Sequence, residues 1–430
     1  MAGRSSDSRP GVRVTNRAPG VPRVLRTLND RTALELLLEQ GPLSRAQIAR
    51  LTGLSKPTAS QMLARLEESG LVVAGGTSAG HPGPGALLYT LNPAAAYVAG
   101  LDVTPGLIRT AVADLTGRTI GTYELTVPEE SGDEVDQVIA AVEGAARAAG
   151  LSSDAIHRVV IGAPRAFDHR AGRLRYPSHL PGWQSPTLLR ELAARLPMPV
   201  DCENDVNLVA IAEGRTGAAR GYEDFFLLWN EEGIGAAMMF GGRLHRGRTG
   251  GAGEVGFMPV PGTPLVRNPE VAETGGYQDL AGCQAVPAMA RRLGIGIGIG
   301  HVADGTEQHP DSGRRGAVDP ALDEAMAILR RASTEAEGPY RKVLEEFATG
   351  VATGLSSIAG VLDPELVVLS GGVFLAGGEP LRALVEAELA ELSASQPPLV
   401  LGDIREHPVL RGALECALAT TRDEVFDTSR

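Results

Sequence analysis

The spacing of apolar residues changes at Asn92-Pro93. Before this point, apolar residues recur at the three- and four-residue intervals of short helices, and after it, apolar strand-like runs alternate with helical stretches. A chain of 430 residues is too long for one ordinary hydrophobic core. We therefore expect a mainly helical domain over residues 21–92 and an α/β domain over 93–430, preceded by a disordered basic arm over 1–20.

The first domain has the element order of a winged helix-turn-helix. A helical stripe of apolar residues that includes Val24 and Leu28 runs through 23–39. Ser44 and Ser55 then each stand at the N-cap position of a further helix. Two strand-like runs follow on either side of a Gly/Pro-rich tip, at 71–73 and 86–91. Three helices and a two-stranded wing are expected.

Charge divides the chain at the same place. Residues 1–92 hold eleven Lys and Arg against six Asp and Glu, so they carry a net charge of +5. The whole chain carries −12, which leaves −17 for the other 338 residues. A basic segment joined to an acidic body is typical of a nucleic-acid-binding module attached to a second domain.

The helix that begins at Ser55 is the expected recognition helix. In a helix-turn-helix the second helix lies in the major groove, and residues near its N-terminus face the base edges. A helical mini-domain that binds protein is the alternative, but the exposed face of this helix is polar and basic until Glu67. We expect DNA contacts from Ser44, Arg45, Ser55, Lys56, Pro57, Thr58, Ser60, Gln61 and Arg65.

The sequence of the second domain predicts an α/β fold in which one unit of strands followed by a helix occurs twice. Apolar strand-like runs are expected at 97–103, 107–114, 118–127, 157–162, 225–229, 234–240 and 366–369. Helices are expected at 133–149, 186–196, 204–217 and 337–361. A strand meander followed by a helix occurs twice, which indicates two related lobes. The Gly-rich and polar stretch 293–318 is expected to be an excursion from this fold.

Three motifs of this domain carry candidate ligand contacts. They are the strand and Gly-Ala-Pro-Arg turn at 159–165 followed by Asp168, the Glu-Asn-Asp-Val-Asn stretch at 203–207, and the Gly-rich stretches 233–236 and 241–242 with Gly-Ala-Gly-Glu-Val-Gly-Phe at 251–257. Convergent carboxylates and amides are what a polyol ligand requires, because each can accept or donate hydrogen bonds in pairs. A plain helix N-cap is the alternative role for Asn204-Asp205.

These motifs, together with the segment SRAQIARLTGLSKPTASQMLARLEESGLV, resemble the ROK family of repressors and sugar kinases over essentially the whole chain. The resemblance implies a two-lobed, actin-like (ribonuclease-H-like) sugar-kinase fold after the winged domain. It also implies sugar contacts from Asn204, Asp205, Glu254 and Gln278, with Asp205 at the position of the catalytic base of the kinase members.

Two family features are altered here. Family kinases hold ATP phosphates with a Gly-Gly-Thr turn, which has become Thr104-Pro105-Gly106. Pro105 has no N–H, and the loss of one such preorganised donor costs on the order of 100-fold in rate. The family's zinc-binding His is replaced by Phe257, and Pro269, Val271 and Gly276 fall at its cysteine positions. We therefore expect no catalysis, metal or cofactor, although an ATP-dependent carbohydrate kinase with a DNA-binding domain remains the alternative.

The sequence thus predicts a DNA-binding regulator, in the simplest case a repressor, of carbohydrate-related genes. Its expected partners are an operator in double-stranded DNA, a sugar or sugar phosphate, and a second copy in a homodimer or dimer of dimers. A ligand-free architectural protein is a third possibility. The three cysteines lack metal-ligand spacing, and no apolar run reaches the ~18 residues of a membrane helix, so a cytoplasmic protein is expected.

Overall fold

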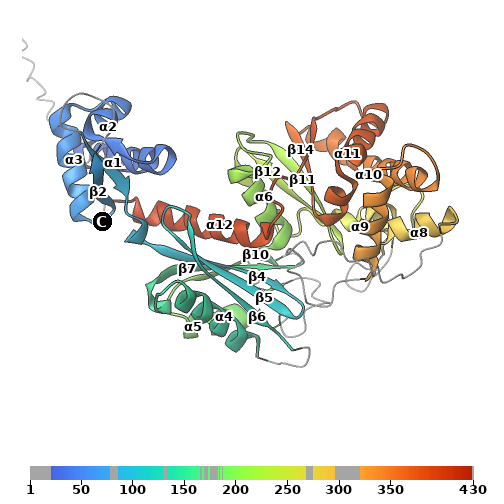
Figure 1. The fold of residues 1–430 in the computed structure, drawn as a ribbon, viewed down its shortest axis with the longest axis horizontal. Coiled ribbons are helices and arrows are strands. Elements are labelled where there is room, and N and C mark those ends of the chain that lie inside the picture. Colours follow the sequence, from blue (N-terminus) through green and yellow to red (C-terminus); the bar gives the residue numbers. More distant parts are fainter. Residues whose placement is uncertain are drawn as a thin grey trace, which may run out of the picture. The chain divides into compact units, whose positions relative to one another are not determined.

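The computed structural model describes residues 21–77, 86–128, 133–164, 167–168, 173–174, 183, 185, 187–267, 275–295 and 320–428. The chain divides into two compact units, one formed by Met1–Ala95 with Arg422–Arg430 and the other by Ala96–Thr421 (Figure 1). The expected arm over 1–20, the wing tip and most of the stretch 293–318 lie outside the described residues. None of the described helices combines the length and the apolar character that a bilayer crossing requires.

The first unit contains the predicted three helices and wing. The helices are α1 (Val21–Gln40), α2 (Arg45–Thr52) and α3 (Lys56–Glu68), and the strands are β1 (Leu43–Ser44), β2 (Val72–Thr77) and β3 (Leu87–Leu91). The strands form a sheet in the order β1-β3-β2, so the short β1 adds a third strand that the sequence did not predict. A 3₁₀ turn, η1 (Pro93–Ala95), follows β3.

The apolar core of this unit begins more than two turns later along α1 than the sequence indicated. Ala33, Leu34 and Leu37 are buried, whereas Val24 and Leu28 are 67% and 58% exposed. The prediction that these two residues belong to the inner stripe was therefore wrong. The helical period continues through them, but the described part of the unit offers no packing partner there.

The last residues of the chain belong to the first unit, not to the second as the sequence indicated. Arg31 of α1 donates to a carboxylate oxygen of Asp423 at 2.5 Å, and the Thr428 hydroxyl donates to Asp30 at 3.0 Å. The helix α12 (Pro408–Val425) is therefore shared, because its residues up to Thr421 belong to the second unit and its last four to the first.

The first lobe of the second unit is built on a five-stranded sheet of order β10-β7-β4-β5-β6. Its strands are β4 (Tyr97–Thr104), β5 (Leu107–Asp114), β6 (Thr119–Thr126), β7 (Ile156–Ala163) and β10 (Val200–Asn204). The first three form the predicted antiparallel meander, and β7 and β10 add parallel strands. The helices α4 (Glu134–Ala148) and α5 (Leu188–Arg195) cover one face (Figure 1). The short elements are η2 (Ser153–Ala155), β8 (Phe167–Asp168) and β9 (Arg173–Leu174).

The second lobe repeats this plan with a sheet of order β13-β12-β11-β14-β15. Its strands are β11 (Phe225–Asn230), β12 (Ile234–Phe240), β13 (Arg243–Leu244), β14 (Leu366–Ser370) and β15 (Leu399–Leu401). One face packs on α7 (Gly276–Ala281), α8 (Ala285–Arg292), α9 (Pro320–Ala332), α10 (Pro339–Leu362) and α11 (Gly372–Leu392), and η3 (Val255–Phe257) lies in the loop before α7. The repeated antiparallel meander with added parallel strands confirms the predicted pair of related lobes.

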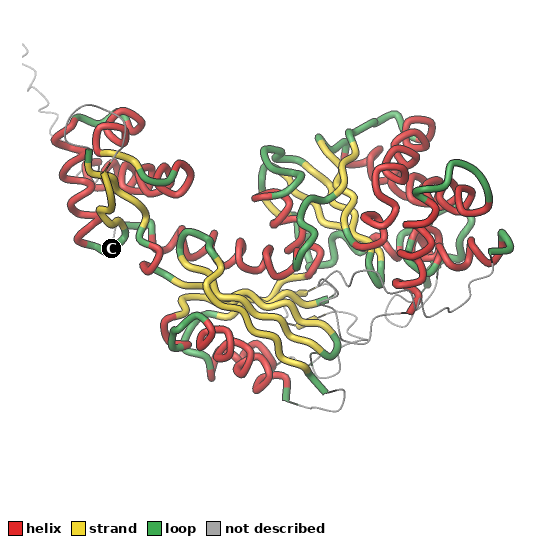
Figure 2. Tube along the Cα trace, in the orientation of Figure 1, coloured by secondary structure: helices red, strands yellow, loops and turns green. Residues whose placement is uncertain are grey.

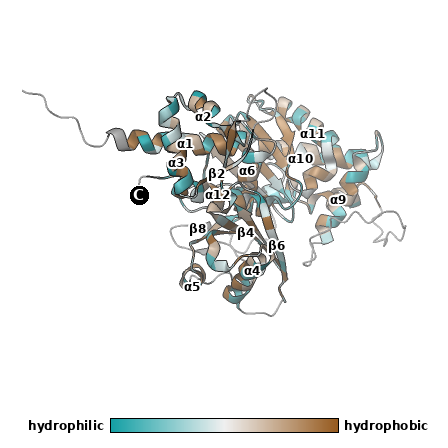
Figure 3. Ribbon diagram, turned by 60° about the vertical axis from the view of Figure 1, so that its left-hand side comes forward, coloured by the Kyte–Doolittle hydropathy of each residue, from teal (hydrophilic) through white to brown (hydrophobic). Residues whose placement is uncertain are grey.

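The helices α6 (Asp205–Thr216) and α12 lie between the two sheets of the second unit (Figure 2). Their apolar residues join side chains from both sheets in one buried cluster. Hydrophobic residues accordingly line the strands and the inner helix faces (Figure 3). At Gly412 of α12 the two helices approach so closely that a Cβ would stand 1.9 Å from the carbonyl oxygen of Leu208.

We predict that Gly412→Ala destabilises the protein by about 3 kcal/mol, because the added methyl group must displace the backbone of α6. Gly360→Ala is the matched control. Gly360 is an exposed glycine inside α10 with no atom within 4 Å of its Cβ position, so alanine there should stabilise by about 0.5–1 kcal/mol. Urea unfolding of both variants measures the difference, and equal stabilities would contradict the close helix packing.

Candidate functional site

The N-terminus of α3 presents a polar surface. Ser55 is its N-cap, and its hydroxyl accepts a hydrogen bond from the Thr58 backbone N–H at 3.4 Å. The side chains of Lys56, Pro57, Thr58 and Gln61 are exposed. The inner face of the helix is apolar and packs in the core of the unit. The structure therefore exposes five of the residues predicted to face DNA at this helix, the exceptions being Ser60 and Arg65.

Three other residues of the predicted DNA set have partners within the protein. Ser44 is 7% exposed and caps α2 in a reciprocal capping box with Gln47, so its hydroxyl is inaccessible to DNA, which corrects its assignment. The Ser60 hydroxyl donates to the Lys56 carbonyl at 3.0 Å. Arg65 forms an ion pair with the buried Asp30 at 2.8 Å, so it stabilises the contact between α3 and α1.

Arg45 differs from these three because it is exposed at the start of α2. Its guanidinium donates to the hydroxyl of Tyr89 on β3 at 2.9 Å and lies 6.0 Å from the centre of that ring. This contact fixes the direction of the side chain between the helices and the wing strands, and leaves further N–H groups of the guanidinium for a phosphate.

At the N-terminus of α6, Asn204 and Asp205 form a small polar network. The Asn204 side-chain oxygen accepts from the Asn207 backbone N–H at 3.1 Å, so the alternative role as a helix N-cap is confirmed for Asn204. Its side-chain amide donates to Asp205 Oδ1 at 3.0 Å. Both residues are half-buried.

Glu203, the last buried carboxylate of β10, organises this network, and the sequence analysis assigned it no role. One of its oxygens accepts from the Asn204 backbone N–H at 2.9 Å and from the Asn207 side-chain amide at 2.8 Å. The other accepts from Arg246 Nε at 2.6 Å. The sequence signal was weak, because Glu203 lies among other polar residues of β10, and only its burial shows that its charge must be paired.

The segments that contain Glu254 and Gln278 are hydrogen-bonded to β12. Ala236 N–H donates to the carbonyl of Gly253, the neighbour of Glu254, at 2.9 Å. Ile234 N–H donates to the Gln278 side-chain oxygen at 2.8 Å. Val206, the neighbour of Asp205, lies within contact distance of Gly235 on that strand. The first residues of β12 therefore bring the three predicted segments together.

Gln278 is also engaged on its other side, because its amide donates to Gln284 Oε1 at 2.8 Å. Its side chain thus connects β12 with α7 and the residues before α8. Contact between Gln278 and a sugar stays a prediction.

The Thr104-Pro105-Gly106 turn, which the sequence predicts in place of a kinase phosphate loop, is a closed hairpin. Thr104 and Leu107 are paired residues of β4 and β5, so Pro105 and Gly106 form a two-residue turn. Gly106 has a φ of 83°, the left-handed conformation that favours glycine. The Thr104 hydroxyl donates to the Leu107 carbonyl at 3.0 Å, which uses the hydroxyl inside the turn.

A second carboxylate that the sequence analysis missed lies at the N-terminus of α11. The Gly372 N–H, in the first turn of that helix, donates to Glu231 Oε1 at 2.8 Å. Helix N-termini are natural sites for phosphate groups because of their free N–H groups and dipole. Here the acidic group at the helix N-terminus is the side chain of Glu231.

The remaining predicted positions hold no metal ligands in the described structure. Phe257 ends η3, and Gly276 begins α7, whereas Pro269 and Val271 lie outside the described residues. Among the residues that are described, no three His, Cys, Asp or Glu side chains are grouped in a way that would hold a metal ion.

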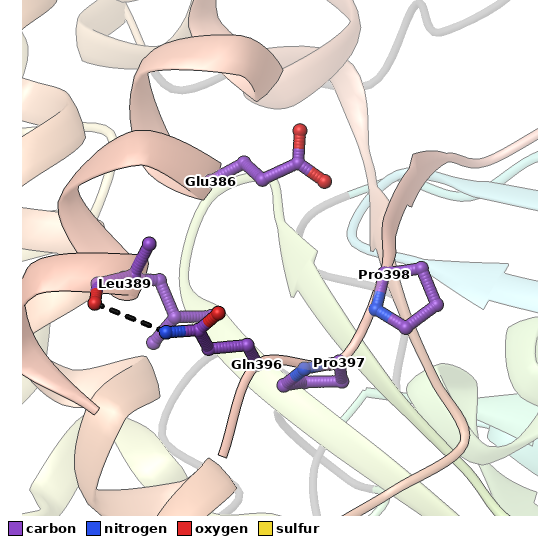
Figure 4. A pocket seen from close by; sticks show the side chains of 6 residues that line it. Glu386, Leu389, Gln396, Pro397 and Pro398 are labelled. Atoms are coloured by element: carbon purple, nitrogen blue, oxygen red, sulfur yellow. Dashed lines mark hydrogen bonds between the residues drawn. The ribbon is translucent and has the colours of Figure 1, made fainter. Parts of the chain in front are cut away.

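One cavity of about 310 Å³ lies away from these residues, at the end of α11 (Figure 4). It is lined by Glu386, Leu389, Ala390, Gln396, Pro397 and Pro398. The Gln396 amide already donates to the Ala390 carbonyl at 3.2 Å. A single carboxylate among apolar and proline side chains does not supply the convergent donors and acceptors that a polyol needs.

Comparison with known proteins extends this description. A putative xylose repressor of Caldicellulosiruptor sp. (strain Rt8B.4) is 23% identical over 84% of this chain and 88% of its own. A solved ROK family transcriptional regulator, described as a homologue of the E. coli MLC protein, covers 94% of this chain and 98% of its own with a TM-score of 0.69 and 16% identity. The ROK hexokinase of Thermus thermophilus covers 76% of this chain and 99% of its own, with a TM-score of 0.60 and 26% identity.

These likenesses agree with the architecture built above, a winged helix followed by a two-lobed α/β domain of the sugar-kinase, actin-like type. Residues 26–81 match the MarR family, and residues 98–420 match the ROK family, which is most of the chain. The protein is therefore a member of the ROK family that carries a MarR-type winged helix at its N-terminal end.

Proposed function

We propose that this protein is a transcriptional repressor of carbohydrate-related genes, controlled by a sugar or sugar phosphate that binds in its ROK domain. The observation that carries the proposal is the exposed, polar and basic N-terminus of α3 on a winged helix, in the same chain as a sugar-kinase fold. The resemblance to a putative xylose repressor over both parts of the chain supports it.

On the DNA side, Ser55, Lys56, Thr58 and Gln61 read the major groove, with Arg45 on a phosphate. The protein acts in the cytoplasm as a homodimer, whose two recognition helices meet half-sites about 34 Å apart or a multiple of that distance. The exposed apolar side chains of α1, namely Val24, Leu25 and Leu28, support association between two copies.

On the effector side, Asn204, Asp205 and Glu254 hydrogen-bond the hydroxyl groups of the ligand. Their segments meet at the first residues of β12, as a site for a polyol requires. An effector that moves operator occupancy from mostly bound to mostly free must prefer one conformation by several kcal/mol, about 5.5 for a change from 99:1 to 1:99.

Sugar phosphorylation is the competing function, and the likeness to a hexokinase and the presence of Asp205 favour it. Two observations oppose it. The Thr104–Leu107 hairpin is closed and includes a proline, and Glu231 supplies a negative charge at the α11 N-terminus, where a phosphate would be repelled. We therefore propose that the ROK domain senses its ligand without phosphorylating it.

The absence of kinase activity is tested by coupled ADP-release assays over a panel of hexoses, pentoses and amino sugars. We expect no turnover above a protein-free blank. Sugar-dependent ADP release that disappears in Asp205→Asn would overturn the proposed sensor role, because it would show that Asp205 acts as a catalytic base.

Lys56→Ala should weaken binding to an operator selected from random duplexes and reduce the slope of log K against log[salt] by about 0.9, the value for one lost phosphate contact. Lys342→Ala, on α10 of the other unit, removes the same charge and should change neither quantity. An unchanged slope in Lys56→Ala would exclude this docking of α3.

Glu254→Ala should keep operator affinity and lose the response to the sugar that raises the melting temperature of the wild type. Asn204→Ser is the companion variant, because serine caps a helix as well as asparagine does but lacks the side-chain amide. We expect its melting temperature without sugar to match the wild type and its sugar response to fall. A full response in both variants would place the effector elsewhere.

A further inference from the structure

A second cavity in the ROK domain lies beside Glu203 and is separate from the proposed sugar contacts. Its volume is about 560 Å³, within the range of small-molecule sites. Its walls come from β7, β10, the loop after β13 and α12. Asn204, Asp205, Glu254 and Gln278 do not line it.

The cavity has more positive than negative charge. Two of its arginines are neutralised, because Arg158 is ion-paired with Asp201, and Arg246 with Glu203 at 2.6 Å. The third, Arg248, is exposed and takes part in no ion pair with a described residue. One unbalanced guanidinium beside two neutral pairs favours an anionic ligand.

The arrangement of donors suits a phosphate group. Arg246 uses its Nε–H for Glu203, and its terminal nitrogens make no hydrogen bond to any residue that the structure describes. Arg248 follows it by two residues, and the two guanidinium groups can each offer paired N–H donors to phosphate oxygens. Gly247 and Gly250, with φ of 68° and 77°, keep this part of the wall free of bulky side chains.

We propose that this cavity binds the phosphate group of a small phosphorylated metabolite through Arg246 and Arg248, as a second ligand site beside the polyol site. A phosphate on the terminal nitrogens of Arg246 would share this guanidinium with Glu203, which also accepts from the Asn204 N–H and the Asn207 amide, and the two anions would repel each other. Occupancy of the cavity is thereby coupled to the first turn of α6. Cys416 and Thr420 place α12, whose last residues belong to the winged unit, on the same cavity wall.

Calorimetric titration of the full-length protein with ribose 5-phosphate, inorganic phosphate and ribose, at constant ionic strength, tests the proposal. We expect ribose 5-phosphate to bind, inorganic phosphate to bind more weakly, and ribose not to bind this site. Arg248→Ala should weaken ribose 5-phosphate binding about tenfold or more, the effect of losing a charged hydrogen-bonding partner. Arg243→Ala, an exposed arginine on β13 outside the cavity, should bind as the wild type does.

Cys416 gives an independent readout of where the ligand sits. Burial, followed by the nearby Glu203 carboxylate, raises the pKa of the Cys416 thiol to about 11. The thiolate is the reactive form, so alkylation by iodoacetamide is slow at neutral pH and is best followed near pH 9 by peptide mass mapping. Ribose 5-phosphate should slow alkylation of Cys416 in the wild type and not in Arg248→Ala.

Equal affinities of wild type and Arg248→Ala, or binding that leaves the Cys416 rate unchanged, would overturn the second site. Glu254→Ala separates this outcome from the proposed sugar response, because Glu254 does not line the cavity. That variant should keep ribose 5-phosphate binding, and loss of binding in it would place the phosphate ligand in the polyol site instead.

Discussion

The buried carboxylate of Glu203 is the contact on which the organisation of the ROK domain depends. Its two oxygens are shared between the backbone and amide of the α6 N-terminus and the guanidinium of Arg246, which belongs to the other lobe. An ionised group with an exposure of 3% is tolerated only when such partners surround it. The ion pair therefore fixes the first turn of α6 against the loop after β13, and through α6 it positions Asn204 and Asp205.

Features that depend on local spacing were predictable from the sequence. The caps at Ser44, Ser55 and Asn204 were identified because capping depends on residues three positions apart. The docking of Asp423 on Arg31 was not, since the two are 392 positions apart and both look like ordinary solvated charges. The helices over 276–292 and 320–332 also went unnoticed, although α8 and α9 are clearly amphipathic, because they stand on either side of the Gly-rich segment.

In the candidate site, too, the sequence gives the type of each residue but not the hydrogen bonds that the residue makes. The motifs indicated which segments meet at β12, but they could not show which hydrogen-bonding groups are already satisfied. Ser44 and Arg65 have the chemistry of DNA contacts, yet one caps a helix in the interior and the other neutralises a buried aspartate. Gln278 likewise accepts from the Ile234 N–H with its side-chain oxygen and donates to Gln284 with its side-chain amide.

The proposed sensor role rests in part on the charge at the N-terminus of α11. The fold retains the glycine turn before α11, whose N-terminal N–H groups attract an anion whatever its source. The Glu231 carboxylate, on the hairpin between β11 and β12, accepts a hydrogen bond from one of these N–H groups. It therefore interacts with the positive end of the helix dipole in place of an anion from solution. Because this carboxylate is covalently part of the chain, a phosphate would have to displace it against charge repulsion. Under the proposed sensor role, one acidic side chain at this helix is therefore enough to disfavour a phosphate while the ROK fold is kept.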